Sequence, residues 1–533
     1  MSAALLATRR PNMLDDYVYK RWAALIISKD GYYVPLLVLV ILFLFSLYVR
    51  PTIHTDSGTG FLVFRSMLEG SGFNMLIEPD AANIANDIAN FETWWSPGQY
   101  LVPGTFVWLG TSYGVALSLT TFFSTVIGVI GWAQVARSFG VTRFVLLVFL
   151  SGLVSFRYVT LPFQMYHGGE VLLFATAPWC FYWMRYAVHK PATTCFAISL
   201  VSAALLFVAK LTGLVVFAAN VLGLTLFEVV QQRRLSASVL AMLTAAAVAA
   251  LCFLVFWAAR SSVPARGAEF SITWPAILFP LAGAAFSGVS ALQLVIGKLS
   301  LPDLLARTYF LGPLGFVLLV WIWYQLRHTR YRAMATVLFG IITFYTVAIA
   351  ILYVHDVRGA QIQVSFEERQ LRYAGIISLL LLLVALDQGE RKMAKGVALI
   401  GVGMFALYGL ASYAAATRVL MRGHYYDTLS GTSQTIVSPI VLEYLRSEIE
   451  EHNWQRAIAA IPGPQPAIAI PRFRIVDVRR QQNWFGRAEK IFVIVPEWWV
   501  ENGEIDKLLN SFVNYRESKW SETHIDGNII YSQ

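Results

Sequence analysis

The sequence predicts an all-α polytopic membrane domain of about eleven transmembrane helices, followed by a small extracytoplasmic α/β domain. Hydrophobic residues make up 57% of the 533 residues and charged residues only 14%, whereas soluble domains carry roughly 25% charged residues. Apolar runs of about twenty residues, each long enough to cross a bilayer, recur as far as residue 416. From about Arg418 the chain becomes polar, with short apolar segments between Pro, Gly and basic residues, which indicates a separate domain.

The distribution of charge orients the predicted membrane domain. Residues 1–31 are basic and are expected in the cytoplasm, because Lys and Arg collect on that side of the membrane. Each short loop that this topology places in the cytoplasm carries at least two Lys or Arg, and the acidic loops fall outside. The transmembrane domain then occupies residues 32–417, and the extracytoplasmic domain residues 418–533. The predicted spans are 32–50, the later part of 99–136, 143–160, 170–187, two within 194–230, 238–258, 309–326, 334–353, 374–387 and 396–416.

Three segments of this domain are not expected to form single, uninterrupted transmembrane helices. The run 99–136 is too long for one span, and its Pro and Gly residues divide it into a short interfacial helix and a span from about 113. The segment 194–230 is interrupted at Lys210–Gly213 and is expected to form two helices that meet on the outer side. Within the second long loop, Trp274–Ile296 is expected to lie in the interface or to re-enter the membrane. The long outer loops are 51–98, 260–307 and 355–373.

The C-terminal domain shows both helix and strand signals. Ser438-Pro439 predicts a capped helix that runs to about Glu451. The apolar segments Ala467–Ile470 and Ile491–Val495 are typical of strands. Glu504–Tyr515 has helical spacing, and Asp526-Gly527 predicts a hairpin turn.

Composition also excludes several functions. The net charge of +9 follows from the excess of Lys and Arg in cytoplasmic loops, so nucleic-acid binding is not indicated. The three cysteines lack metal-ligand spacing, and the sequence contains no convincing phosphate-binding loop, dinucleotide fingerprint or catalytic serine motif. No Asn-X-Ser/Thr sequon occurs, which is consistent with a bacterial inner-membrane protein whose C-terminal domain is periplasmic.

Asp56 is the leading candidate for chemistry, because it lies a few residues beyond the first span in an acidic loop that also contains Glu92. It would act as a general base or as a metal ligand for an acceptor, and His54 would assist it. The alternative is a solvated loop carboxylate near the end of a helix.

Other candidates lie at the predicted outer ends of later spans. Glu170 and His167 flank Gly168-Gly169, and Glu170 would either belong to the site or only stabilise the start of its helix. Lys210 would bind a phosphate, unless it merely reaches the interface. Arg157 ends the third span and is an accessory candidate. The last set directly precedes the span 374–387 and combines two arginines suited to phosphate with a tyrosine: Arg369, Arg372 and Tyr373. The alternative is a surface ion-pair cluster with Glu367 and Glu368, with the tyrosine at the membrane interface.

The chain resembles the GT-C superfamily of polytopic glycosyltransferases, which includes protein O-mannosyltransferases and the aminoarabinose transferases that modify lipid A. The matching features are Asp56 in a long first outer loop, the sequence Trp95-Ser96-Pro97-Gly98-Gln99-Tyr100-Leu101 before the next helix, and Glu368-Arg369-Gln370-Leu371-Arg372-Tyr373 before a late span. The architecture of many helices followed by an outer domain also matches.

This resemblance implies sugar transfer from a polyprenyl-phosphate sugar donor to an extracytoplasmic acceptor. Asp56 would be the base or metal ligand, Lys210 and Arg372 would contact the phosphate, and Glu170 would be a second acidic group. The first loop carries Asp-Ser where protein O-mannosyltransferases carry Asp-Glu, so a lipid or glycan acceptor is favoured over a protein. No cofactor is required by the motifs, although a divalent cation, Mg or Mn, would fit the chemistry. Membrane lipids are expected partners, and the oligomeric state is not indicated.

Two other functions remain open. A transporter or flippase of lipid-linked oligosaccharides usually carries ionisable residues or broken helices at mid-membrane, often in repeated halves. The candidate charges here gather at predicted outer helix ends and no internal repeat is visible, which favours an enzyme. A non-catalytic subunit for envelope polysaccharide assembly would need the C-terminal domain but not Asp56.

Overall fold

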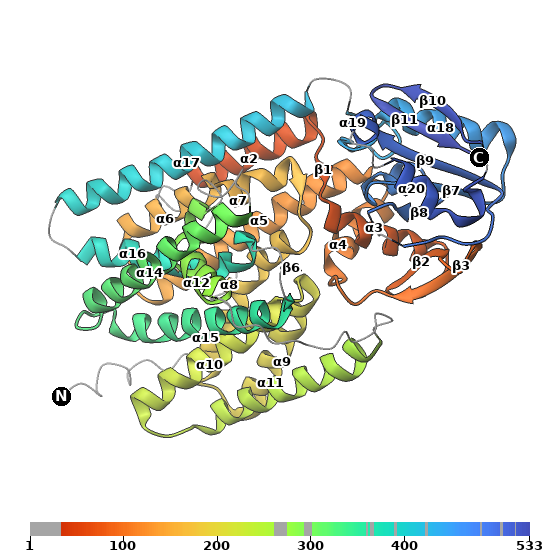
Figure 1. The fold of residues 1–533 in the computed structure, drawn as a ribbon. Helices are drawn as coiled ribbons and strands as arrows, with labels where there is room; N and C mark the ends of the chain where they lie inside the picture. The colour runs from red at the N-terminus through yellow and green to blue at the C-terminus, as the bar shows by residue number, and fades with distance from the viewer. Residues whose placement is uncertain are drawn as a thin grey trace.

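The computed structural model describes residues 33–260, 274–292, 301–358, 361–362, 367–388, 392–421, 425–479, 482–501, 505–517 and 519–533. A bundle of long helices forms one domain, and a smaller domain with a five-stranded sheet lies at one end of it (Figure 1). The helices of the larger domain are α2 (Tyr33–Tyr48), α4 (Gly98–Trp108), α5 (Tyr113–Ser138), α6 (Arg143–Ser155), α7 (Arg157–Thr160), α8 (Gly169–Ala187), α9 (Ala192–Ala209), α10 (Gly213–Gln232), α11 (Ala237–Phe256), α12 (Trp274–Phe286), α14 (Leu301–Leu326), α15 (Arg332–Asp356), α16 (Glu368–Gln388) and α17 (Lys392–Leu420).

The prediction of an integral membrane protein is confirmed. Among the described residues, eight helices are long and apolar enough to cross a membrane, and a ninth span results if α6 and the segment Arg157–Phe163, bent by 51°, are taken together. Each predicted span coincides with one of the helices or with this bent pair. The number of eleven crossings stays a prediction, because α2 and α8 are not among the helices that meet the length and composition criteria.

Two of the unusual segments fold as predicted. The run 99–136 divides into α4 and α5, and the break at Lys210 separates α9 from α10. The stretch after Trp274 forms α12 and a short 3-10 helix at Ser287–Val289, both packed on α16. Its last residues, from 293, lie outside the described residues.

The expected loop 51–98 contains regular structure. It forms strand β1 (Thr52–Ile53), helix α3 (Thr55–Leu68) and a hairpin of β2 (Met75–Asp80) and β3 (Asn83–Phe91). The small residues Gly58 and Gly60 lower intrinsic helix propensity, but they allow α3 to pack closely: a Cβ on Gly58 would lie 2.9 Å from the backbone nitrogen of Gln465. Tertiary contact therefore stabilises a helix that propensity alone does not indicate.

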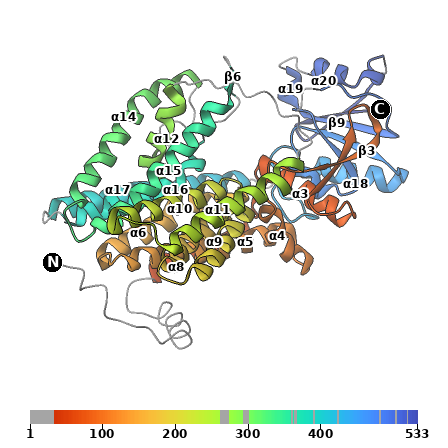
Figure 2. The same cartoon turned by 90° about the horizontal axis from the view of Figure 1, so that it is seen from below.

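The C-terminal domain is a three-layer α/β sandwich. Its strands are β7 (Ala457–Ile461), β8 (Phe473–Asp477), β9 (Lys490–Pro496), β10 (Ser521–Ile525) and β11 (Asn528–Ser532), in the order β10-β11-β9-β7-β8. Strands β8 and β9 both run parallel to β7, whereas β10, β11 and β9 are antiparallel neighbours. Helix α18 (Pro439–His452) covers one face, and α19 (Glu497–Glu501) and α20 (Ile505–Ser511) lie on the other (Figure 2).

The capped helix at Ser438, the strand at Ile491–Val495 and the turn at Asp526-Gly527 are confirmed. The strand predicted at Ala467–Ile470 is wrong, because Gln465–Ala469 form a 3-10 helix, η4. Pro464 and Pro466 flank and interrupt this segment, and proline lacks the N–H that a strand donates. The helix predicted over Glu504–Tyr515 is shorter, since α20 ends at Ser511 and a 3-10 turn follows.

Helix α3 joins the two domains. Arg65, which is buried on α3, donates hydrogen bonds to three backbone carbonyl oxygens of the C-terminal domain, at 3.2 Å, 3.4 Å and 2.7 Å. Those oxygens belong to Ala467, Ile470 and Phe473. Burial lowers the pKa of Arg65, yet an arginine stays charged in proteins, so its hydrogen bonds hold the η4 segment firmly against α3.

Candidate functional site

Two short parallel strands bring the first candidates together. Strand β1 pairs with β4 (Met165–Tyr166), with Thr52 opposite Met165 and Ile53 opposite Tyr166. Each strand leads directly into a helix, β1 into α3 and β4 into α8. Segments more than a hundred residues apart in the sequence therefore start two neighbouring helices at the same place.

Both helices carry a carboxylate in the first turn, Asp56 on α3 and Glu170 on α8. A helix N-terminus stabilises negative charge, because its first backbone N–H groups have no partner within the helix. His54 caps α3 by accepting a hydrogen bond from the backbone N–H of Asp56 at 3.3 Å. The sequence thus places two anions side by side at the helix starts.

The Gly168-Gly169 pair is explained by close packing. Gly168 has φ +65°, and a Cβ there would lie 2.6 Å from Oε1 of Gln99 and 2.8 Å from Oγ of Ser57. A Cβ on Gly169 would lie 2.7 Å from the carbonyl oxygen of Ala209. Glycine therefore lets the start of α8 approach α3, α4 and the break between α9 and α10.

Lys210 occupies that break and faces Glu170. Its ammonium nitrogen lies 2.8 Å from Oε1 of Glu170, and the two side chains are only 18% and 7% exposed. The ion pair satisfies a cation that would otherwise be costly at the end of an apolar helix.

Arg369 bridges the two carboxylates. Its Nη2 lies 2.6 Å from Oδ2 of Asp56, its Nη1 lies 3.3 Å from Oε1 of Glu170, and its Nε donates to Glu367. The sequence predicted that Arg369, Arg372 and Tyr373 precede a span. That placement is corrected, because α16 begins at Glu368 and all three side chains project from its first turns.

The two histidines complete the cluster. The rings of His54 and His167 stack with centroids 4.7 Å apart, and Nδ1 of His54 lies 3.6 Å from Oδ2 of Asp56. Burial lowers the pKa of both imidazoles, and that of His167 falls well below 6.5 because His54 and two arginines also disfavour a second positive charge. Both rings are therefore neutral at pH 7.

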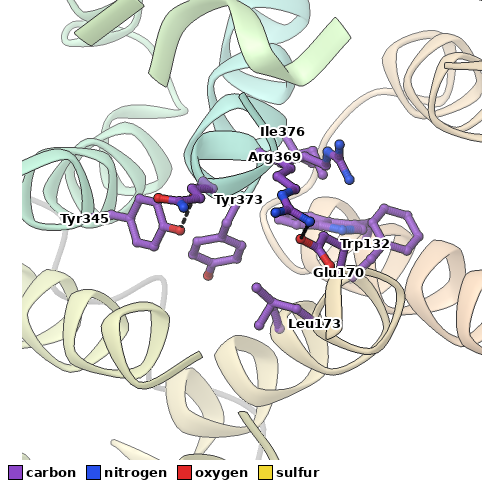
Figure 3. Close-up of a pocket in the computed structure, with 11 residues that line it drawn as sticks. Trp132, Glu170, Leu173, Tyr345, Arg369, Tyr373 and Ile376 are labelled. Carbon is purple, nitrogen blue, oxygen red and sulfur yellow. Dashed lines mark hydrogen bonds and ion pairs between the residues drawn. The ribbon is translucent and has the colours of Figure 1, made fainter. Parts of the chain in front are cut away.

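Among the candidate cations of this cluster, Arg372 has a buried N–H without a hydrogen-bond partner in the described part of the chain. It is half-buried, its guanidinium carbon lies 4.8 Å from the centre of the Tyr158 ring, and its buried Nε has no hydrogen-bond partner among the described residues. Arg372, Arg369 and Glu170 line one pocket with aromatic and aliphatic side chains (Figure 3). A buried arginine N–H without a partner is a strong donor for an anion.

Tyr373 forms part of the wall of this pocket. Its hydroxyl donates to Oδ1 of Asn220 on α10 at 2.7 Å, and its ring lies beside Trp132 and Tyr345 (Figure 3). The pocket is narrow, with about 30 Å³ of room for the centre of a water molecule.

Two candidates lie elsewhere. Glu92 accepts a hydrogen bond from the backbone N–H of Trp94 at 2.7 Å, just after β3. Arg157 starts α7, which packs on α17. Their accessory roles stay predictions.

Sequence reasoning missed the contribution of the C-terminal domain. Gln465 donates from Nε2 to the hydroxyl of Thr55, the residue before Asp56. Trp132 and Tyr345, which line the pocket, were also missed. An aromatic residue within an apolar span carries no signal that separates a pocket wall from ordinary packing. Within the described residues, no group of three or more His, Cys, Asp or Glu side chains could hold a metal ion.

Comparison with known proteins shows the fold. No protein-family model and no curated protein matches this sequence. The structure is similar to ArnT from Cupriavidus metallidurans bound to undecaprenyl phosphate, with a TM-score of 0.51 and 12% identity over 95% of this chain and 98% of that chain. It is also similar to ArnT from the same organism in the apo state, with a TM-score of 0.50 and 13% identity over 97% of this chain and 98% of that chain. The chain therefore shares its fold with ArnT over nearly the full length of both chains, with the helical membrane domain followed by a small α/β domain that the sequence predicts.

Proposed function

We propose that this protein is a membrane glycosyltransferase that moves a sugar from a polyprenyl-phosphate donor to an extracytoplasmic lipid or glycan acceptor. The observation that carries the proposal is the buried Nε of Arg372, which has no partner among the described residues, on a side chain that lines a pocket with Arg369. Two arginines one helical turn apart suit a phosphate at the membrane boundary. The likeness to ArnT supports the donor class, since that protein has been solved bound to undecaprenyl phosphate.

In this proposal Asp56 is the general base. Both of its contacts involve Oδ2, its Oδ1 makes no hydrogen bond to a described residue, and the side chain is 26% exposed. The acceptor oxygen attacks the anomeric carbon of the donor while its proton passes to Oδ1 of Asp56. The bond from that carbon to the phosphate oxygen breaks, and the electron pair leaves with the phosphate.

The cations act on the leaving group. Arg369, Arg372 and Lys210 would neutralise the charge that develops on the departing phosphate, which is electrostatic stabilisation of the transition state. Glu170 is the proposed second acidic group, and we assign it a positioning role because its Oε1 contacts both Lys210 and Arg369. The proposed orientation places this cluster and the C-terminal domain on the periplasmic side of the bacterial inner membrane.

The decisive experiment is transfer of radiolabelled sugar from extracted polyprenyl-phosphate sugars by the full-length protein in lipid nanodiscs. Asp56→Asn should lower transfer by roughly 10²- to 10⁴-fold, the usual contribution of general base catalysis, while binding of undecaprenyl phosphate is retained. Asp80→Asn is the matched control, because Asp80 lies on the β2–β3 hairpin and, among the described residues, its side chain bonds only a neighbouring backbone N–H.

Other results of this experiment would support a different base or a different function. Equal transfer by wild type and Asp56→Asn would move the base to Glu170. No transfer with any donor, together with movement of the labelled lipid between leaflets, would favour the flippase. No transfer and no lipid movement would favour the assembly subunit.

A further inference from the structure

The C-terminal domain contains a groove that the transfer reaction described above does not use. Its volume is about 860 Å³, which lies within the usual range of roughly 300–1,000 Å³ for ligand sites. Its described lining includes the basic side chains of Arg479, Lys507 and Arg516, the amides of Asn483 and Asn510, and the ring of Trp499.

The groove lies where open α/β sheets bind ligands. Val478 and Arg479 directly follow β8, and Trp499 belongs to α19, which directly follows β9. Because β8 and β9 both run parallel to β7, these residues leave the sheet at its carboxyl edge. The chain passes from β7 to β8 on one side and returns to β9 on the other, so the carboxyl edge is also a topological switch point.

The lining selects for an anionic, hydroxyl-rich ligand. Arg479, Lys507 and Arg516 supply positive charge, and none of the described lining residues is acidic. Arg479 is held by both oxygens of Asp477 and Arg516 donates to the carbonyl oxygen of Asn510 at 2.8 Å, whereas Lys507 is exposed. The amides can bond sugar hydroxyls, and the ring of Trp499 offers an apolar face for a sugar ring.

A short chain of contacts joins the groove to Asp56. Gln465 donates to Thr55, next to Asp56. Gly463 has φ +120°, and a Cβ there would lie 2.4 Å from Oε1 of Gln465 and 3.5 Å from Cζ of Arg479. The bond to Asp477 raises the pKa of Arg479, and the charge of Asp56 adds to that effect. Arg479, which lines the groove, therefore lies close to the segment that contacts Thr55, the residue before Asp56.

We propose that this groove binds the acceptor as an acidic saccharide, one that carries carboxylate or phosphate groups, and presents its end to Asp56. The inference rests on the proposed transferase function and adds the acceptor class to it. Lys507 would contact the acidic group directly, and Trp499 would pack against a sugar ring.

The test is direct binding to the full-length protein in nanodiscs of phosphatidylcholine, which separates acceptor binding from catalysis. The ligands are trigalacturonic acid as a carboxylate source, glucose 1-phosphate as a phosphate source and maltotriose as a neutral saccharide. Binding of undecaprenyl phosphate is measured on the same samples. Its failure would count against the proposed function, whereas its success together with failure of both acidic sugars would count against the groove alone.

Lys507→Glu should weaken binding of the preferred acidic saccharide on the order of tenfold or more, because one charge-assisted hydrogen bond is lost. Lys519→Glu is the matched control, because Lys519 is an exposed lysine of the same domain that does not line the groove. Trp499→Ala should weaken the binding of saccharides without changing the binding of undecaprenyl phosphate. Equal effects of Lys507→Glu and Lys519→Glu, or binding of maltotriose as tight as that of the acidic sugars, would overturn the proposal.

Discussion

Lys210 and Glu170 allow a structural ion pair to be separated from a donor-binding site. Lys210→Met removes a cation that lies 2.8 Å from Oε1 of Glu170, with both side chains largely buried. If Lys210 also binds the donor phosphate, its loss should lower both the stability of the protein and its affinity for the donor. A second change, Glu170→Gln, should alter the effect on stability but not the effect on donor affinity. The four proteins of this double-mutant cycle therefore distinguish the two roles.

The expected magnitudes follow from the geometry. Breaking a buried ion pair by removing one partner costs about 3–5 kcal/mol of stability, but Arg369 still reaches Glu170 at 3.3 Å. We therefore expect Lys210→Met to lower the free energy of unfolding by about 2–3 kcal/mol. The loss should be less than about 1 kcal/mol in the Glu170→Gln background, where residue 170 carries no charge. Loss of a charge-assisted hydrogen bond to phosphate is worth about 1.5–3 kcal/mol, which is roughly a 10- to 150-fold weaker Kd for the donor.

The assay combines thermal unfolding with binding of undecaprenyl phosphate in nanodiscs. Stability should depend on Lys210 only when Glu170 is charged, whereas donor affinity should depend on Lys210 in both backgrounds. A loss of affinity that disappears with Glu170→Gln would refute phosphate contact and leave Lys210 as a partner of Glu170. Lys395→Met is the matched control, because Lys395 pairs with buried Asp387 at 3.0 Å and should change stability without changing donor affinity.

Further predictions concern the domain contact and the histidines. Arg65→Met removes three hydrogen bonds to the C-terminal domain and should cost about 3–5 kcal/mol, measured by thermal unfolding. Gly58→Ala should slow sugar transfer about tenfold or more, because its Cβ would lie 2.9 Å from the backbone of η4, whereas Gly396→Ala, with nothing within 4 Å, should not. Burial lowers the pKa of His54 and His167, so the unfolded chain binds more protons below about pH 6.5. Stability should therefore fall as the pH drops from 7.5 to 5.5, and fall less in His167→Gln; equal acid sensitivity of both proteins would contradict this assignment.

The fold class and many residues of the charged cluster around Asp56 could be predicted from the sequence, because a membrane imposes strong patterns of hydrophobicity and charge. Apolar length locates the helices, and a charge at the end of such a run, as at Lys210, is conspicuous because it is costly. The same reasoning found Asp56 in the loop just beyond the first span and Glu170 at the start of a helix. It could not show that one arginine bridges them, because β1 and β4 pair only in the tertiary structure.

Short-range signals failed where long-range packing decides the conformation. Helix α3 contains glycines and few apolar repeats, yet it is helical because the C-terminal domain packs on it. Ala467–Ile470 is apolar enough for a strand, yet the prolines before it favour the 3-10 helix that touches α3. Both errors fall at the contact between the domains. Gln465, which also escaped prediction, lies there as well, whereas Trp132 and Tyr345 line the pocket in the helical domain.

In the proposed function, the charge balance of the cluster would link donor binding to activation of Asp56 as the base. Lys210 and Arg369 face three carboxylates, those of Asp56, Glu170 and Glu367, and the pocket beside them is narrow. Arg372 lines the same pocket, so three cations face these three carboxylates, and the proposed donor phosphate would add negative charge and compete with a carboxylate for Arg369. Glu170 keeps Lys210 when this happens, whereas the only cationic side chain that Asp56 contacts among the described residues is Arg369. We infer that the phosphate releases Asp56, which then accepts the proton of the acceptor only when a donor is in place.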